Sequence, residues 1–134
     1  MNDKNIDSET EDVLNLLLFV ITADSKILKE EIESFRTVAA ELNLSDRQGI
    51  ALSDQWVSNW FEKNSEAVRQ ESGRPEADSK LVHLFIRLQK WPNKIKLLDA
   101  LCHVAASDGQ FHINEKVLIT LAAAYWDINS PQMN

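Results

Sequence analysis

The sequence predicts an all-α protein folded as one domain. Apolar residues recur at spacings of three and four along most of the chain, as they do on one face of a helix. Glycine and proline occur only three times each, at breaks in that pattern. No stretch alternates apolar and polar residues in the manner of a β-strand. A chain of 134 residues is long enough to build a hydrophobic core without disulfides or a structural metal.

Six helices can be placed along the chain. Residues 1–10 are polar and acidic and are expected to form a loose tail, residues 11–128 the helical domain, and 129–134 a C-terminal tail. Ser45 and Gln48 have the spacing of a capping box and predict the start of the third helix. Pro92 suits the first position of the fifth. The expected helices cover residues 9–23, 29–42, 45–63, 77–90, 92–107 and 112–126.

A connector poor in apolar residues, 62–80, separates two halves that repeat each other. Asp24 falls on Asp108 with an offset of 84 residues (108 − 24), and Glu31 falls on Glu115 with the same offset. The apolar pairs that follow this offset include Val20 with Val104, Ile27 with Phe111 and Phe35 with Ile119. Each half therefore predicts a helical hairpin with an Asp-containing turn, and duplicated hairpins usually pack about a pseudo-twofold axis.

Asp24 and Asp108 each lie where a helix ends, on the side of its apolar residues. A carboxylate there meets the negative pole of the helix dipole as well as apolar neighbours, so it needs compensation. The sequence leaves two arrangements open. Each Asp can accept N–H hydrogen bonds within its turn while Glu31 and Glu115 act as helix caps. Alternatively, the Asp and Glu can converge on a hard divalent cation of the Ca²⁺ or Mg²⁺ type.

Neighbouring residues bear on the cation alternative. A capping box has Ser, Thr, Asp or Asn at the N-cap, whereas this chain has Leu28 and His112 there, so the Glu is kept without its usual partner. An EF-hand is excluded, because the twelfth position counted from Asp108 is Ile119 and the sixth is Ile113, where a Glu and a Gly are required. A cation site here would have a geometry of its own.

Two segments resemble a known family. The segment VAASDGQFHINEK at 104–116 resembles the second half of tellurite-resistance B-like (TerB-like) proteins, and VITADSKILKEE at 20–31 resembles the first half. The resemblance spans residues 12–127 and implies a compact all-α fold of about seven helices, a stress-response role that includes tellurite resistance, and acidic clusters that bind metal. The acids that match the motifs are Asp24, Glu30, Glu31, Asp108 and Glu115.

The chain departs from the family pattern at three positions. Ser25 replaces the usual Gly. His112 and Asn114 stand where the family often has acids or a small capping residue, which makes them weaker candidate ligands and leaves the second site with less charge. Related domains also occur in membrane-tethered co-chaperones, but the chain has no His-Pro-Asp signature.

Composition and motifs narrow the function further. The net charge of −7, from 14 basic and 21 acidic residues, argues against nucleic acid and is compatible with a protein partner. The longest apolar run is too short for a membrane span, and the single cysteine, Cys102, predicts a reducing, cytoplasmic location. No catalytic motif is present, so no enzyme activity is expected.

His103 and Asp99, four residues apart, would form an ion pair or, less simply, bind a metal. We therefore expect a non-enzymatic stress-response domain with acidic metal sites that recruits partners, or a purely structural interaction module.

Overall fold

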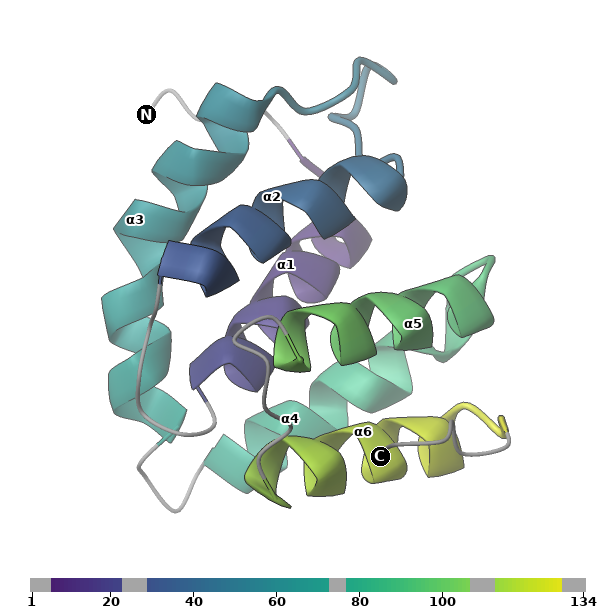
Figure 1. Ribbon diagram of the computed structural model, residues 1–134. Coiled ribbons are helices and arrows are strands. Elements are labelled where there is room, and N and C mark those ends of the chain that lie inside the picture. Colours follow the sequence, from purple (N-terminus) through teal and green to yellow (C-terminus); the bar gives the residue numbers. More distant parts are fainter. Residues whose placement is uncertain (1–5, 23–28, 73–76, 107–112, 129–134) are drawn as a thin grey trace.

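The described part of the chain is built from helices alone. The computed structural model describes residues 6–22, 29–72, 77–106 and 113–128, without the side chains of 29–31, 71–72, 77–78 and 113–115. Over these residues the only β-type pairing is an isolated bridge between Ser45 and Ala51, and the all-α prediction is confirmed. The helices are α1 Ser8–Ile21, α2 Lys29–Glu41, α3 Asp54–Ser72, α4 Ala77–Arg87, the short 3-10 helix η2 Leu88–Lys90, α5 Lys94–Ala105 and α6 Ile113–Tyr125 (Figure 1).

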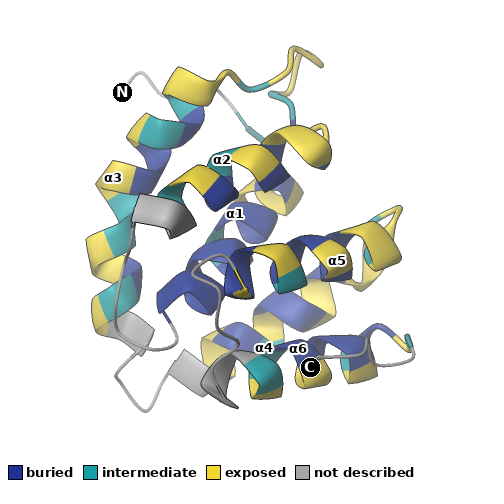
Figure 2. Ribbon diagram, in the orientation of Figure 1, coloured by how far each residue is buried: buried dark blue, intermediate teal, exposed yellow. Residues whose placement is uncertain are grey.

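Helix α1 lies at the centre of the molecule and contacts α2, α3, α4 and α5. From Asp12 to Ile21 every residue except Asn15 is buried. Figure 2 shows most of α1 in dark blue, whereas α2 and α5 carry many exposed residues in yellow. A helix that is apolar around its whole circumference reaches a stable position only when other elements cover it. The run LLLFVI therefore dictates the central place of this helix.

The first helix begins within residues 1–10, which were expected to form a loose tail. Asp7 accepts a hydrogen bond from the backbone N–H of Thr10 at 2.9 Å, so α1 starts at Ser8. This bond lowers the pKa of Asp7, because it favours the charged carboxylate. At the other end, the Thr22 hydroxyl donates to the Leu18 carbonyl at 2.9 Å and satisfies one of the last acceptors of the helix.

The predicted 84-residue repeat is present in the backbone. Helices α2 and α6 both have 13 residues, and their first and last residues are offset by 84 (113 − 29 and 125 − 41). Helices α1 and α5 end with the same C-cap geometry at the same offset. The cap N–H of Thr22 reaches the carbonyls of Leu18 and Val20, and that of Ala106 reaches those of Cys102 and Val104. The chain therefore contains two equivalent helical hairpins, α1–α2 and α5–α6.

Both hairpins also end in the same turn, at the same offset. Asn43 and Asp127 each have φ of 56°, in the left-handed region. The following amides, of Leu44 and Ile128, donate back to the carbonyls of Ala39 and Ala123 at 3.3 and 2.9 Å. This pattern is a Schellman motif, whose left-handed residue is usually glycine. Asn and Asp are the residues other than glycine that most readily adopt this conformation.

Glycine substitutions at these two positions are expected to stabilise the protein by different amounts. Asp127→Gly removes the left-handed strain and also a negative charge at the C-terminal pole of α6, so the free energy of unfolding should rise by about 1 kcal/mol. Asn43→Gly removes only the strain, and a gain of about 0.5 kcal/mol is expected. Urea unfolding of both variants measures the difference. A larger gain for Asn43→Gly would contradict the assignment of a dipole contribution to Asp127.

The predicted start of the third helix is wrong. Residues 43–53 form a loop in which the Asp46 carboxylate accepts the backbone N–H groups of Gln48 and Ile50 at 2.9 and 3.0 Å. Gly49 completes the turn with φ of 83°. The helix starts at Asp54, because Ser53 caps it by accepting the N–H of Trp56 at 3.0 Å.

The expected connector is also shorter than predicted, since α3 continues to Ser72 and α4 begins at Ala77. Val68 is buried and holds this last part of α3 against the core.

The first half of α3 packs on α2 through aromatic rings. Phe35 stacks on Trp60 with ring centroids 6.0 Å apart and meets Phe61 edge-on at 5.0 Å.

Candidate functional site

The acidic residues predicted to bind metal fall at the two hairpin turns. Asp24, Asp108 and His112 lie outside the described residues. Glu30 and Glu31 lie in the first turn of α2, and Asn114 and Glu115 in the first turn of α6. Their backbone is helical as predicted, but their side chains are outside the described part of the molecule. The prediction that these side chains hold a cation therefore stays a prediction.

The described helices that flank residues 23–28 and residues 107–112 are arranged equivalently. Residues 23–28 join α1 to α2, and residues 107–112 join α5 to α6. Helices α1 and α5 contact each other and run in the same direction, so both turns follow helix ends on the same side of the molecule (Figure 1). Asp24 stands two residues after the C-cap Thr22, and Asp108 two residues after the C-cap Ala106.

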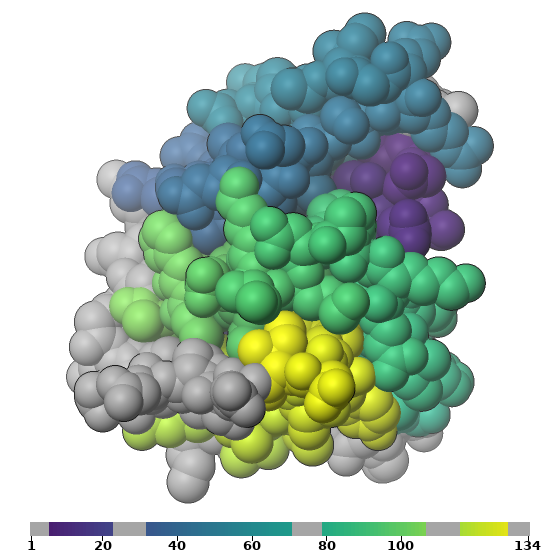
Figure 3. All heavy atoms as spheres, turned by 90° about the vertical axis from the view of Figure 1, so that its right-hand side faces the viewer, coloured from purple at the N-terminus to yellow at the C-terminus, as the bar shows by residue number. Residues whose placement is uncertain are grey.

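No group of three or more His, Cys, Asp or Glu side chains that could hold a metal ion occurs within the described ranges. Of the two histidines that the sequence offered as metal ligands, His103 is the one within the described residues, and it faces another element. Its Nδ1 lies 3.8 Å from Oε1 of Glu41 across the interface of α2 and α5. Figure 3 shows the surface of α2 (blue) directly against that of α5 (green). Lys96 and Asp99 also line a groove of about 520 Å³ at this interface, and its charged side chains are exposed, as on an ordinary solvated surface.

A second groove, which no sequence pattern predicts, lies between α1 and α4. Its volume is about 340 Å³, and its lining residues are Asn15, Phe19, Lys80, His83, Leu84 and Arg87. At one end Arg87 forms a bidentate pair with Asp12, with Nε and Nη2 at 2.9 and 3.0 Å from the two carboxylate oxygens. The Asp12 side chain is 11% exposed and that of Arg87 is 55% exposed. These hydrogen bonds raise the pKa of the Arg87 guanidinium.

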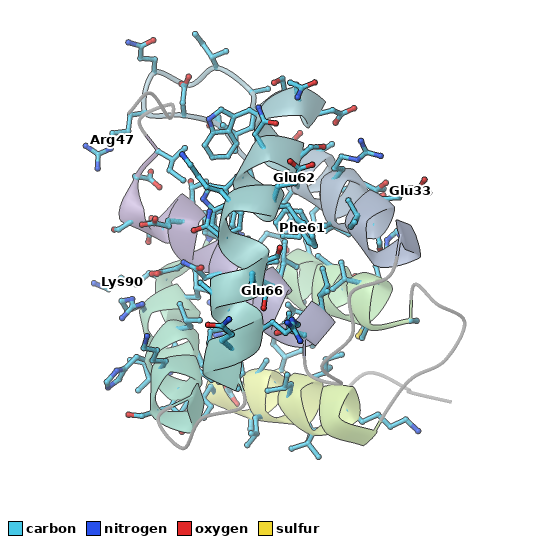
Figure 4. The ribbon with its side chains drawn as sticks, turned by 90° about the vertical axis from the view of Figure 1, so that its left-hand side faces the viewer. Glu33, Arg47, Phe61, Glu62, Glu66 and Lys90 are labelled. Carbon is cyan, nitrogen blue, oxygen red and sulfur yellow. The ribbon has the colours of Figure 1, made fainter. Side chains whose placement is uncertain are left out.

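The surface around α3 is divided by charge. In Figure 4 Glu62 and Glu66 project from α3 and Glu33 from α2, whereas Arg47 and Lys90 lie at the opposite edge of the view. Phe61 points inward between α3 and α2, consistent with its contact with Phe35. Glu66 is engaged by Arg69 one turn later, and this hydrogen bond lowers the pKa of Glu66. The acids of this face are ordinary exposed side chains of a solvated helix.

Cys102 has the environment of a structural thiol. It is half-buried on α5, and burial together with the nearby charge of Asp99 raises its pKa. The thiolate is the reactive form, so a raised pKa makes the group less reactive at neutral pH. No nucleophilic role is assigned to it.

Several large apolar side chains remain exposed. Val117 and Leu121 lie one turn apart on the outer face of α6 and are 53% and 40% exposed. Ile86 of α4 and Ile95 of α5 are also exposed. No described helix is both long and apolar enough to cross a membrane.

Comparison with known proteins found no matching family model, no matching curated protein and no matching solved structure. The resemblance to TerB-like proteins therefore rests on the two sequence motifs that contain Asp24 and Asp108.

Proposed function

We propose that this protein is a non-enzymatic, TerB-like helical module that binds a divalent cation at its two hairpin turns and recruits partner proteins in a stress response. The observation that supports it is the equivalence of the helix ends around the two turns. Each turn follows a C-cap with the same pattern of backbone hydrogen bonds, precedes a helix of the same length and carries its Asp two residues after the cap. A duplicated position for a carboxylate at the unfavourable pole of a helix suggests that a cation compensates both.

In this proposal the cation is of the Ca²⁺ or Mg²⁺ type, and its ligands are oxygen atoms. Asp24 with Glu30 and Glu31 would serve the first turn, and Asp108 with Glu115 the second. The second turn has fewer acids, because His112 and Asn114 replace candidates there. We therefore expect the first site to bind more tightly, since ligand charge sets much of the affinity for a hard cation.

A specific observation also favours a purely structural interaction module. The outer face of α6 exposes Val117 and Leu121, and exposed apolar residues that lie together often mark a protein contact. In that alternative, Asp24 and Asp108 accept hydrogen bonds within their turns, and Glu31 and Glu115 cap the helices that follow.

A thermal unfolding scan with and without Ca²⁺ or Mg²⁺ separates the two proposals. An ion at about ten times its dissociation constant should add about 1.4 kcal/mol of stability, or a rise in melting temperature of roughly 5 °C. Asp24→Asn should reduce this gain because it removes carboxylate charge. Asp108→Asn should also reduce it, and without metal it should slightly raise stability by relieving repulsion with Glu115 and the helix pole.

Asp127→Asn is the matched control, because it removes one charge outside the turns and Asn is accepted in the left-handed conformation. It should keep the full ion response. If the melting temperature of the parent does not change with either ion, and Asp108→Asn is simply tolerated, the cation proposal fails and the structural module stands.

A further inference from the structure

The outer face of α6 carries a continuous stripe of uncharged side chains. Val117, Thr120, Leu121 and Ala124 are all exposed, and their spacing places them on one side of the helix. Figure 1 shows α6 along the lower edge of the molecule, and Figure 2 shows exposed residues in yellow on it. The sequence has no charged residue from position 117 to position 126, so the stripe is an uncharged surface about two helical turns long.

The equivalent helix of the first hairpin shows that the fold does not require this stripe. Helix α2 repeats α6 at the offset of 84 residues, and the positions that correspond to Val117 and Leu121 are exposed there too. In α2 these positions are occupied by Glu33 and Thr37, as is usual on the solvated side of a helix. The apolar residues of α6 therefore belong to this surface rather than to the repeated fold, and they indicate a contact with another molecule.

Opposite charges stand at the two ends of the stripe. Lys116 precedes it and Asp127 follows it, and neither has an ion-pair partner among the described residues. They are eleven residues apart (127 − 116), or about three helical turns, so their Cα atoms fall on the same side of the helix axis, beside the stripe. When two copies of α6 pair in antiparallel orientation about a twofold axis, the ends are exchanged and the side is kept. Lys116 of each copy then lies beside Asp127 of the other.

We propose that α6 is the contact surface of a weak homodimer, in which the uncharged stripes of two copies pack against each other in antiparallel orientation. The small side chains of Thr120 and Ala124 let the two helix backbones approach closely, and Val117 and Leu121 supply apolar area. A second copy is then the partner of the face on which the structural alternative rests, and this contact does not require cation binding at the hairpin turns.

The size of the stripe sets the strength of this contact. Helix α6 has 13 residues and is about 20 Å long, so one face of it buries less than the roughly 800 Å² per partner of a stable interface. The net charge of −7 on each copy adds repulsion, which salt reduces. We therefore expect a dissociation constant on the order of 100 µM.

Sedimentation equilibrium of the full chain in EDTA, between about 10 µM and about 1 mM, tests this assignment at constant ionic strength. The average mass should rise from that of the monomer toward that of the dimer. The double variant Val117→Glu/Leu121→Thr gives the stripe the residues that stand at the equivalent exposed positions of α2. It should keep the helical fold of the parent and associate at least roughly tenfold more weakly.

Ile50→Glu is the matched control for the stripe. Ile50 is 55% exposed, close to the 53% of Val117, and the substitution adds the same charge. It lies in the loop of residues 43–53, at the opposite end of the molecule from α6 (Figure 1). Ile50→Glu should therefore associate as the parent does.

A charge exchange tests both the antiparallel orientation and the identity of the partner. Lys116→Glu and Asp127→Lys should each weaken self-association roughly fivefold, because like charges then meet at both ends of the paired stripes. An equimolar mixture of the two variants should associate as tightly as the parent, since opposite charges meet again at both ends of the mixed pair.

The homodimer is ruled out if the mass stays that of the monomer up to about 1 mM. Association of the double variant as tight as that of Ile50→Glu would place the contact on another surface and overturn the proposal. A mixture of Lys116→Glu and Asp127→Lys that associates no more tightly than either variant alone would overturn the antiparallel pairing. None of these results bears on the ion response of the hairpin turns, which the melting scan measures independently.

Discussion

Replacement of Phe85 by alanine is expected to lower the free energy of unfolding by about 4 kcal/mol, the usual cost of deleting a fully buried aromatic ring. Phe85 is 0% exposed and joins α4 to α6. Its ring centroid lies 5.6 Å from that of Tyr125 and 5.9 Å from that of Trp126, and its carbonyl accepts the Trp126 indole N–H at 2.9 Å. Alanine would leave a cavity where α4 and α6 meet, and helices cannot close such a gap without losing other contacts.

The neighbouring Ile86 provides a matched control for Phe85. It occupies the same helix but is 46% exposed, so Ile86→Ala should cost no more than about 1 kcal/mol. Denaturant unfolding of the two variants measures both values. Similar losses for Phe85→Ala and Ile86→Ala would contradict the packing of α6 against α4 through the Phe85 ring.

The second large effect on the free energy of unfolding is expected at the ion pair of Asp12 and Arg87. The loss should differ according to which of the two residues is replaced. Arg87→Ala should cost about 2 kcal/mol, because it leaves the nearly buried Asp12 carboxylate without its partner. This value lies below the cost for a fully buried pair, since the groove admits water on the side of Arg87. Asp12→Ala should cost only about 1 kcal/mol, because the half-exposed guanidinium can turn to water.

The double variant gives the sharpest check of this asymmetry. In the Arg87→Ala background, Asp12→Ala should restore part of the lost stability, because it removes the unpaired buried carboxylate. Urea unfolding of the four proteins yields the coupling between the two residues. If the double variant is the least stable of the four, Asp12 has another stabilising partner, and an unpaired carboxylate is not the cause of the loss in Arg87→Ala.

The first and last residues of a helix were predicted well where the sequence offered only one candidate residue to begin or end that helix. The limits of α1, α2, α5 and α6 lie within two residues of the prediction, because long apolar repeats end at short polar turns. The third helix was misplaced because Ser45 and Ser53 offer similar caps. Only Ser53 is used, since Asp46 accepts the N–H groups that a helix from Ser45 would have needed.

The candidate sites differ in how far the sequence could predict them. The turns that carry Asp24 and Asp108 were predicted because an internal repeat can be detected from the amino-acid sequence alone. The C-cap and Schellman geometry of the flanking helices repeats with the same offset. The α1–α4 groove could not be found in this way. Asn15 and Arg87 line the same groove although they are 72 residues apart (87 − 15), and that arrangement depends on how two helices pack in register.

The central position of α1 has a consequence for the order in which the protein can assemble during synthesis. This helix precedes all its neighbours in the chain, yet its last face is covered only by α5, which ends at Ala105. Until those residues have left the ribosome, the run LLLFVI has no complete partner surface and is a site for chaperone binding or self-association. The chain therefore assembles late and nearly all at once, around a helix that was made first.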